Sequence, residues 1–73
     1  MFIVIEIQIT NNQTASNILT THSTRDEAES KFHTILSFAA VSEALTHGAL
    51  IMDDTGTIVK YENYDHRPPE NQE

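Results

Sequence analysis

The chain of 73 residues contains no cysteine and no tryptophan, and it has only two glycines and two prolines. Without cysteine there can be no disulfide bonds and no thiolate metal sites. With Gly48 and Gly56 as its only glycines, the chain has no glycine-rich phosphate loop. No segment approaches the ~20 apolar residues that cross a bilayer, and the first residues lack the pattern of a signal peptide. We therefore expect a cytoplasmic protein with no membrane partner.

Basic residues are also scarce, with four Lys and Arg against eleven Asp and Glu and a formal charge of −7. A nucleic-acid binder needs a basic stripe that neutralises phosphates, and these few cations are scattered along the chain. The acidic residues are dispersed as well, which is typical of a solvated surface rather than of a DNA mimic. We expect no DNA or RNA polymer as a partner.

A chain this short holds one core, and crude accounting of burial against conformational entropy comes out near zero for such domains. Tight packing or self-association must then add stability, since disulfide bonds are excluded. Both sources of stability stay open at this point.

Residues 2–10 have the alternation of a strand, with isoleucine at positions 3, 5, 7 and 9 and with Glu6 and Gln8 between them. The isoleucine face is expected to be the core face. Asn11-Asn12 suits a tight turn, after which residues 16–22 can pair back as a second strand.

A helix is expected to begin at Thr24, because Thr24 and Glu27 have the spacing of a capping box. Its apolar stripe, which should lie on the sheet, consists of Ala28, Phe32, Ile35, Leu36 and Ala39. Another apolar group, made of Phe38, Val41 and Leu45, points away from that stripe. Either the helix bends or ends near Val41, or these side chains meet a partner.

After Gly48, residues 49–52 form a short apolar strand, residues 53–56 a turn and residues 57–64 a last strand. The predicted fold is α+β, with the order ββαββ, a four-stranded, mainly antiparallel sheet and one helix packed on one face. Residues 1–64 form the single domain. Residues 65–73, which include Pro68-Pro69, are expected to be a disordered acidic C-terminal tail.

No motif indicates catalysis. Asp54-Thr55-Gly56 follows an apolar strand, as in half of an aspartic-protease site, but the other parts of such an enzyme are missing and a hairpin turn explains these residues. Four histidines are present, yet none is spaced from another as metal ligands on a helix or strand would be. We expect no enzymatic activity, no cofactor and no metal site.

The apolar residues exceed what one helix on one sheet can cover. The outer sheet face, with Phe2, Val4 and Leu19, or the helix flank could form the contact of a homodimer or a higher homo-oligomer. The predicted oligomer interface comprises Phe2, Val4, Phe38, Val41 and Leu45. A bent helix that covers its own flank is the alternative.

Three segments, residues 1–8, residues 26–42 and residues 47–52, together resemble short uncharacterised proteins encoded by phages and prophages of gut bacteria. The similarity would extend over residues 1 to about 66. It implies a phage context without a mechanism. It also implies that the helix ends near Val41 and that residues 42–46 form a loop.

Two classes of function follow as expectations. The first is a phage binding protein that counters host defence, either by sequestering a host signalling nucleotide or by blocking a host protein. Its ligand would lie near Lys31, His33, His47 and Lys60. The alternative is a structural or accessory virion or assembly protein without a ligand.

Overall fold

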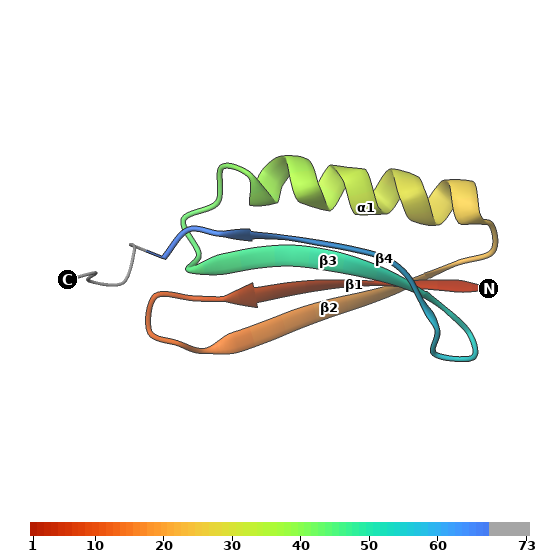
Figure 1. Cartoon of the computed structure of the whole chain (residues 1–73), viewed down its shortest axis with the longest axis horizontal. Helices are drawn as coiled ribbons and strands as arrows, with labels where there is room; N and C mark the ends of the chain where they lie inside the picture. The colour runs from red at the N-terminus through yellow and green to blue at the C-terminus, as the bar shows by residue number, and fades with distance from the viewer. Residues whose placement is uncertain (68–73) are drawn as a thin grey trace.

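A computed structural model of the chain describes residues 1–67. Its elements follow the order β1 (Phe2–Ile9), β2 (Ala15–His22), α1 (Arg25–Ala39), β3 (Thr46–Asp53) and β4 (Ile58–Asp65). The strands form one antiparallel sheet with the order β2-β1-β3-β4, and α1 lies across one face of it (Figure 1). The predicted α+β fold is confirmed.

The first strand, β1, is central and has a partner on each side. It pairs with β2 through a hairpin in which the Thr10 amide donates to the Thr14 carbonyl at 3.0 Å. Within this turn Gln13 has a φ of 65°. On its other side β1 pairs with β3 over its full length, from Phe2 opposite Asp53 to Ile9 opposite Thr46. The sheet is therefore completed only by a strand distant in sequence.

The helix begins and ends near the predicted positions. Thr24 is extended and its hydroxyl oxygen accepts from the Glu27 amide at 3.2 Å, which satisfies one free amide of the first turn. The Glu27 carboxylate accepts a hydrogen bond from the Ser23 hydroxyl at 3.4 Å, whereas the capping box predicted a bond to the Thr24 backbone. Because α1 ends at Ala39, the prediction of a helix end near Val41 is confirmed.

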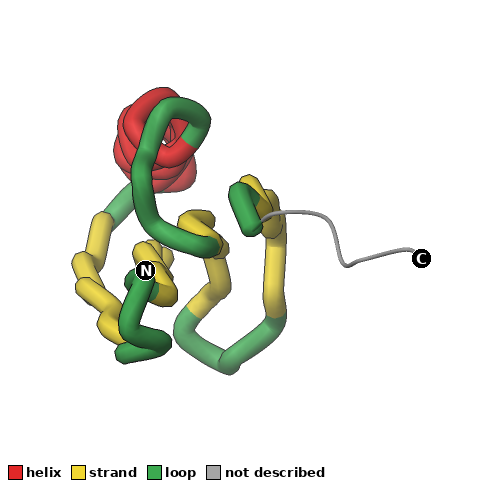
Figure 2. Tube along the Cα trace, turned by 90° about the vertical axis from the view of Figure 1, so that its left-hand side faces the viewer, coloured by secondary structure: helices red, strands yellow, loops and turns green. Residues whose placement is uncertain are grey.

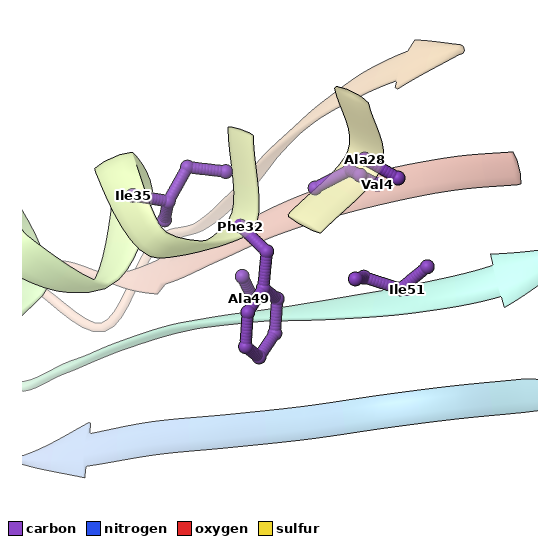
Figure 3. Close-up of a cluster of buried hydrophobic side chains, with 6 residues drawn as sticks. All are labelled: Val4, Ala28, Phe32, Ile35, Ala49 and Ile51. Carbon is purple, nitrogen blue, oxygen red and sulfur yellow. The ribbon is translucent and has the colours of Figure 1, made fainter. Parts of the chain in front are cut away.

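The core lies between α1 and the two central strands (Figure 3). Phe32 from α1 is 2% exposed and packs with Val4 of β1 and Ile51 of β3, which are fully buried. Half of the cluster consists of small or short side chains, and the full set is Val4, Ala28, Phe32, Ile35, Ala49 and Ile51. The helix contributes its predicted stripe.

The predicted orientation of β1 is wrong. Val4 lies beneath the helix, and because side chains alternate along a strand, Ile3 and Ile5 point to the opposite face. The isoleucine face, predicted as the core, is the face that α1 does not cover. Figure 2 views α1 end-on and shows it on one side of the strands only.

Gly48 permits the close pairing of β3 with β4. A Cβ atom at this position would lie 2.5 Å from the carbonyl oxygen of Glu62 and 2.8 Å from the Cα of Asn63. Both atoms belong to the backbone of the paired strand, so no side-chain rotation could relieve the overlap. The position therefore requires glycine for steric reasons.

The predicted disordered tail begins too early. Asp65 belongs to β4, and beyond it His66 is held by two hydrogen bonds. Its amide donates to the Leu45 carbonyl and its Nε2 donates to the Ala39 carbonyl, each at 2.8 Å. These bonds attach the end of β4 to the segment that follows α1. Residues 68–73 of the predicted tail lie outside the described residues.

Candidate functional site

The open face, meaning the sheet face that α1 leaves uncovered, consists mainly of apolar side chains. Strand register assigns its residues, because directly paired residues of antiparallel strands point to the same side. Ile5 is paired with Leu19 and with Leu50, and Leu50 is paired with Tyr61. The apolar members of the open face are Ile3, Ile5, Ile7, Ile9, Leu19, Leu50, Met52, Ile58 and Tyr61.

Side chains at the two edges of this face are exposed, and those in the middle are partly covered only by their neighbours on the sheet. Leu19 is 56% exposed, while Ile58 and Tyr61 are each 59% exposed. Within residues 1–67 the single charged strand residue on this side is Asp65, at the end of β4, where its carboxylate binds the Arg67 guanidinium at 2.7 Å. The open face is thus apolar and almost uncharged on a strongly acidic chain.

The residues of the predicted oligomer interface differ in burial, and only two of the five are exposed. Val4 is fully buried under α1, and Phe2 is half-buried against the same core, so the prediction that they lie on an uncovered sheet face is wrong. Phe38 is 66% exposed and Val41 is 80% exposed, as the prediction requires. Leu45 is half-buried, and its backbone is held by bonds to Ile9 and His66.

Two of the predicted ligand residues meet at one carboxylate. The Lys60 ammonium binds Glu29 Oε1 at 2.8 Å, and Nε2 of His33 lies 3.5 Å from the same oxygen. Lys60 also lies over the Phe32 ring, with its Nζ 5.7 Å from the ring centroid. Both side chains therefore contact Glu29 of the helix, and their local environment is a carboxylate rather than an anion-binding pocket.

His47 occupies a different environment beneath the helix. Its side chain is 6% exposed and its Nε2 lies 2.7 Å from Oε2 of Glu6, whose side chain is 18% exposed. Nδ1 of His47 is buried and has no hydrogen-bond partner in the described structure. This pair is a polar contact inside the core layer.

The last predicted ligand residue, Lys31, is half-buried and lies two positions after Glu29, about 200° around the helix. It therefore faces the flank of α1 opposite to the carboxylate that Lys60 and His33 share. The four residues do not converge on one site. Among residues 1–67 no group of three or more His, Asp or Glu side chains could hold a metal ion.

The Asp53–Gly56 segment is a hairpin turn, as predicted. Oδ1 of Asp53 accepts from the amides of Thr55 and Thr57 at 2.9 and 3.0 Å and from the Thr55 hydroxyl at 2.6 Å. These bonds lower the pKa of Asp53, with the Thr55 hydroxyl as the largest cause. Gly56 has a φ of 92°, which a turn of this kind assigns to glycine. Asp53, not Asp54, closes the turn.

The carboxylates of Glu29, Asp53 and Asp65 have lowered pKa values, so we expect the fold to lose stability in acid. The Arg67 side chain lowers the pKa of Asp65 from 3.8 to about 2, and the hydrogen bond from Lys60 lowers the pKa of Glu29. A group whose pKa is lower in the folded than in the unfolded state stabilises the fold above its unfolded pKa, and this contribution disappears as the pH falls through its folded pKa. Unfolding in urea should therefore need less denaturant at pH 2 than at pH 5.

Asp53→Asn is the matched variant for this prediction, because the amide oxygen can still accept the turn hydrogen bonds and only the titration is lost. Its urea midpoint should depend less steeply on pH over the same interval. An equal slope for the variant and the unchanged protein would show that Asp53 does not contribute.

Comparisons with protein-family models, with curated proteins and with solved structures find no match. The resemblance to phage proteins therefore stays a prediction. Within the described residues, no helix has both the length and the apolar character needed to span a bilayer.

Proposed function

We propose that the chain is a non-catalytic, self-associating module in which the open face of one copy packs on the open face of another. The observation that supports this proposal is the combination of exposed apolar side chains and missing charge on that face. Of the two functional classes expected from the sequence, these features favour the assembly protein over the ligand-sequestering protein. Sequestration needs polar groups that converge, and the four predicted ligand residues are separated.

The small core is a second support. The fully buried apolar residues include Ala28, Ala39 and Ala49, so much of the contact between α1 and the sheet is made by methyl groups. A domain of this size is only marginally stable, and such domains often gain stability by burying apolar surface outside their single core. Covering the open face would bury a second apolar layer on the opposite side of the same strands.

The size of the face suits a specific contact. Four strands of eight residues present a flat projection of roughly 500 Å² at the standard strand spacing and rise. Two such faces remove about 1,000 Å² from water, the size at which specific protein interfaces begin. Sheets pack face to face in this way when their inner side chains are apolar.

Charge identifies a second copy as the occupant. A formal charge of −7 on each copy makes most approaches between copies unfavourable. The open face avoids this repulsion, because the acidic side chains of α1, of the turns and of the helix side of the sheet lie elsewhere. An acidic surface would instead be required to recruit a basic partner here.

The test is the molar mass in dilute solution, measured by sedimentation equilibrium for the unchanged chain and for Leu50→Glu. Leu50 lies in the middle of the open face, opposite Ile5, so a carboxylate there would be buried without a partner in the assembly. We expect an oligomer for the unchanged chain and half its mass for the variant. The thermal midpoint of the unchanged chain should also rise with protein concentration.

Two further variants serve as controls. Tyr61→Glu alters a side chain of the open face that is already 59% exposed, so it should dissociate the oligomer without harming the fold. Val41→Glu makes a similar change at an 80% exposed residue outside this face and should leave the mass unchanged. A monomeric unchanged chain, or dissociation by Val41→Glu but not by Tyr61→Glu, would contradict the proposal.

A further inference from the structure

The second unpartnered feature is a sheet edge. The strand order β2-β1-β3-β4 leaves β2 and β4 with a neighbour on one side only. We propose that the free edge of β2 pairs antiparallel with β2 of a second copy and forms a continuous eight-stranded sheet. This contact is separate from the packing of open faces, and either could form without the other.

Register and alternation identify the free backbone groups. The Thr14 carbonyl accepts from the amide of Thr10, the residue after β1, and in an antiparallel pair every second residue bonds to the neighbouring strand. The even-numbered residues of β2 therefore bond to β1. The amides and carbonyls that point away from β1 belong to Ala15, Asn17, Leu19 and Thr21.

The two edges differ in protection. Proteins block free edges with charged side chains, proline or bulges, because an open edge pairs readily with another strand. On β4 the register shifts at Ile51/Met52, and the strand contains Lys60, Glu62 and Asp65. On β2 there is no Lys, Arg, Asp, Glu or Pro along all eight residues. Only the β2 edge lacks the features that prevent pairing.

A second β2 is the partner that best suits this edge. An acidic chain with a charge of −7 can approach a copy of itself where charge is absent, and β2 is such a place. Ile18, on the helix side of β2, is 55% exposed although it lies in the middle of the strand. Pairing across a two-fold axis near Ile18 would place the two isoleucines side by side.

The geometry of that pair follows from the alternation. Outward-pointing groups occur at odd positions only, so odd residues of one β2 must bond to odd residues of the other. Their side chains lie on the open face in both copies, and the two helices consequently lie on the same side of the joined sheet. The open faces then form one surface of about twice the area. Packing two such surfaces face to face gives four copies.

Amide hydrogen exchange of the unchanged protein, resolved by residue, tests the edge directly. In a chain with a free edge, the amides of Asn17, Leu19 and Thr21 face solvent and exchange rapidly. In the paired edge they should be protected to a similar degree as Ser16, Ile18 and Thr20, which bond to β1 and serve as the internal reference. Rapid exchange at the three odd positions beside slow exchange at the even ones would overturn the proposal.

Asn17→Pro and Asn17→Ala form the matched pair of variants. Proline removes an outward amide that β1 does not use, and edge strands tolerate it, whereas alanine keeps the amide. We expect Asn17→Pro to halve the molar mass and Asn17→Ala to leave it unchanged. Circular dichroism of both variants is the check that each is folded. Equal masses for the two variants would contradict pairing through this edge.

Combination with the open-face variant separates the two contacts. Leu50→Glu should leave a dimer whose odd β2 amides stay protected, and Asn17→Pro should leave a dimer that Tyr61→Glu dissociates further. If Leu50→Glu keeps the molar mass of the unchanged protein and its odd β2 amides are protected, pairing through the β2 edge is supported and packing of open faces is refuted. If the odd β2 amides of the unchanged oligomer exchange rapidly and Leu50→Glu dissociates that oligomer, only pairing through the β2 edge is refuted.

Discussion

Replacing Phe32 with alanine is expected to remove a large part of the stability of the fold and to lower the urea midpoint strongly. Phe32 is the largest of the fully buried side chains, and its ring lies over β3 beside Ala49 in the core cluster (Figure 3). Truncating a buried phenylalanine costs about 3–5 kcal/mol, whereas a domain of this length has roughly 4–11 kcal/mol in total. The substitution also removes the ring that faces the Lys60 ammonium. Urea unfolding at a fixed protein concentration measures the change.

Phe38→Ala is the matched control, because the same substitution is made in the same helix. Phe38 is 66% exposed, so little apolar burial is lost, and alanine is the better helix former. The expected change in the free energy of unfolding is below about 1 kcal/mol. Comparable losses for the two variants would mean that Phe38 is covered in solution, as the sequence-based prediction of an interface at this residue requires.

The second large effect concerns Glu6 and His47. Replacing either residue by leucine leaves the other largely shielded from water and without this hydrogen bond. Nδ1 of His47 makes no hydrogen bond that could compensate. Breaking a buried pair in this way costs about 3–5 kcal/mol if both groups are charged and about 1–3 kcal/mol if they are neutral. Either loss would be a large fraction of the total stability.

The double variant Glu6→Leu with His47→Leu is expected to be more stable than either single variant. Both side chains lie on the helix side of the sheet, so two leucines would extend the apolar layer beneath α1. A double-mutant cycle of urea midpoints measures the coupling between the two positions. Additive losses would show that the two side chains contribute independently, contrary to the 2.7 Å contact between them.

The order and type of the elements could be predicted from local patterns. Alternating isoleucines indicated β1, Thr24 with Glu27 indicated the start of α1, and the Asp53–Gly56 segment indicated the last hairpin. Each of these signals depends on a few neighbouring residues. That is why they identified the elements without their arrangement.

The side of the sheet that α1 covers could not be predicted in the same way. Strands β2 and β3 are parallel to each other with β1 between them, so the path from β2 through α1 to β3 is a crossover connection. The hand of such a connection decides which face the helix covers, and the alternation along β1 contains no information about it. Ile5 and Val4 were therefore assigned to the wrong faces.

The open face could have been recognised from the sequence only with the strand register. Leu19, Leu50 and Tyr61 are apolar in phase with the isoleucines, but that phase appears when the strands are aligned. The interior position of His47 was equally hidden, since its partner Glu6 is distant in sequence. The separation of Lys31 from Lys60 depends on the helix and on its place over the sheet.

The central position of β1 has a consequence for how the chain acquires its structure. β1 is the first strand to be synthesised, yet one of its two neighbours lies 37 to 51 positions later, from Ile9 with Thr46 to Phe2 with Asp53. Until β3 has left the ribosome, β1 has only the hairpin with β2, and an isolated two-stranded hairpin is barely stable in water. Non-local pairing of this kind folds slowly and leaves apolar strands open to aggregation in the meantime. The nascent chain therefore passes through an interval in which its most isoleucine-rich segment still lacks one of its two neighbouring strands.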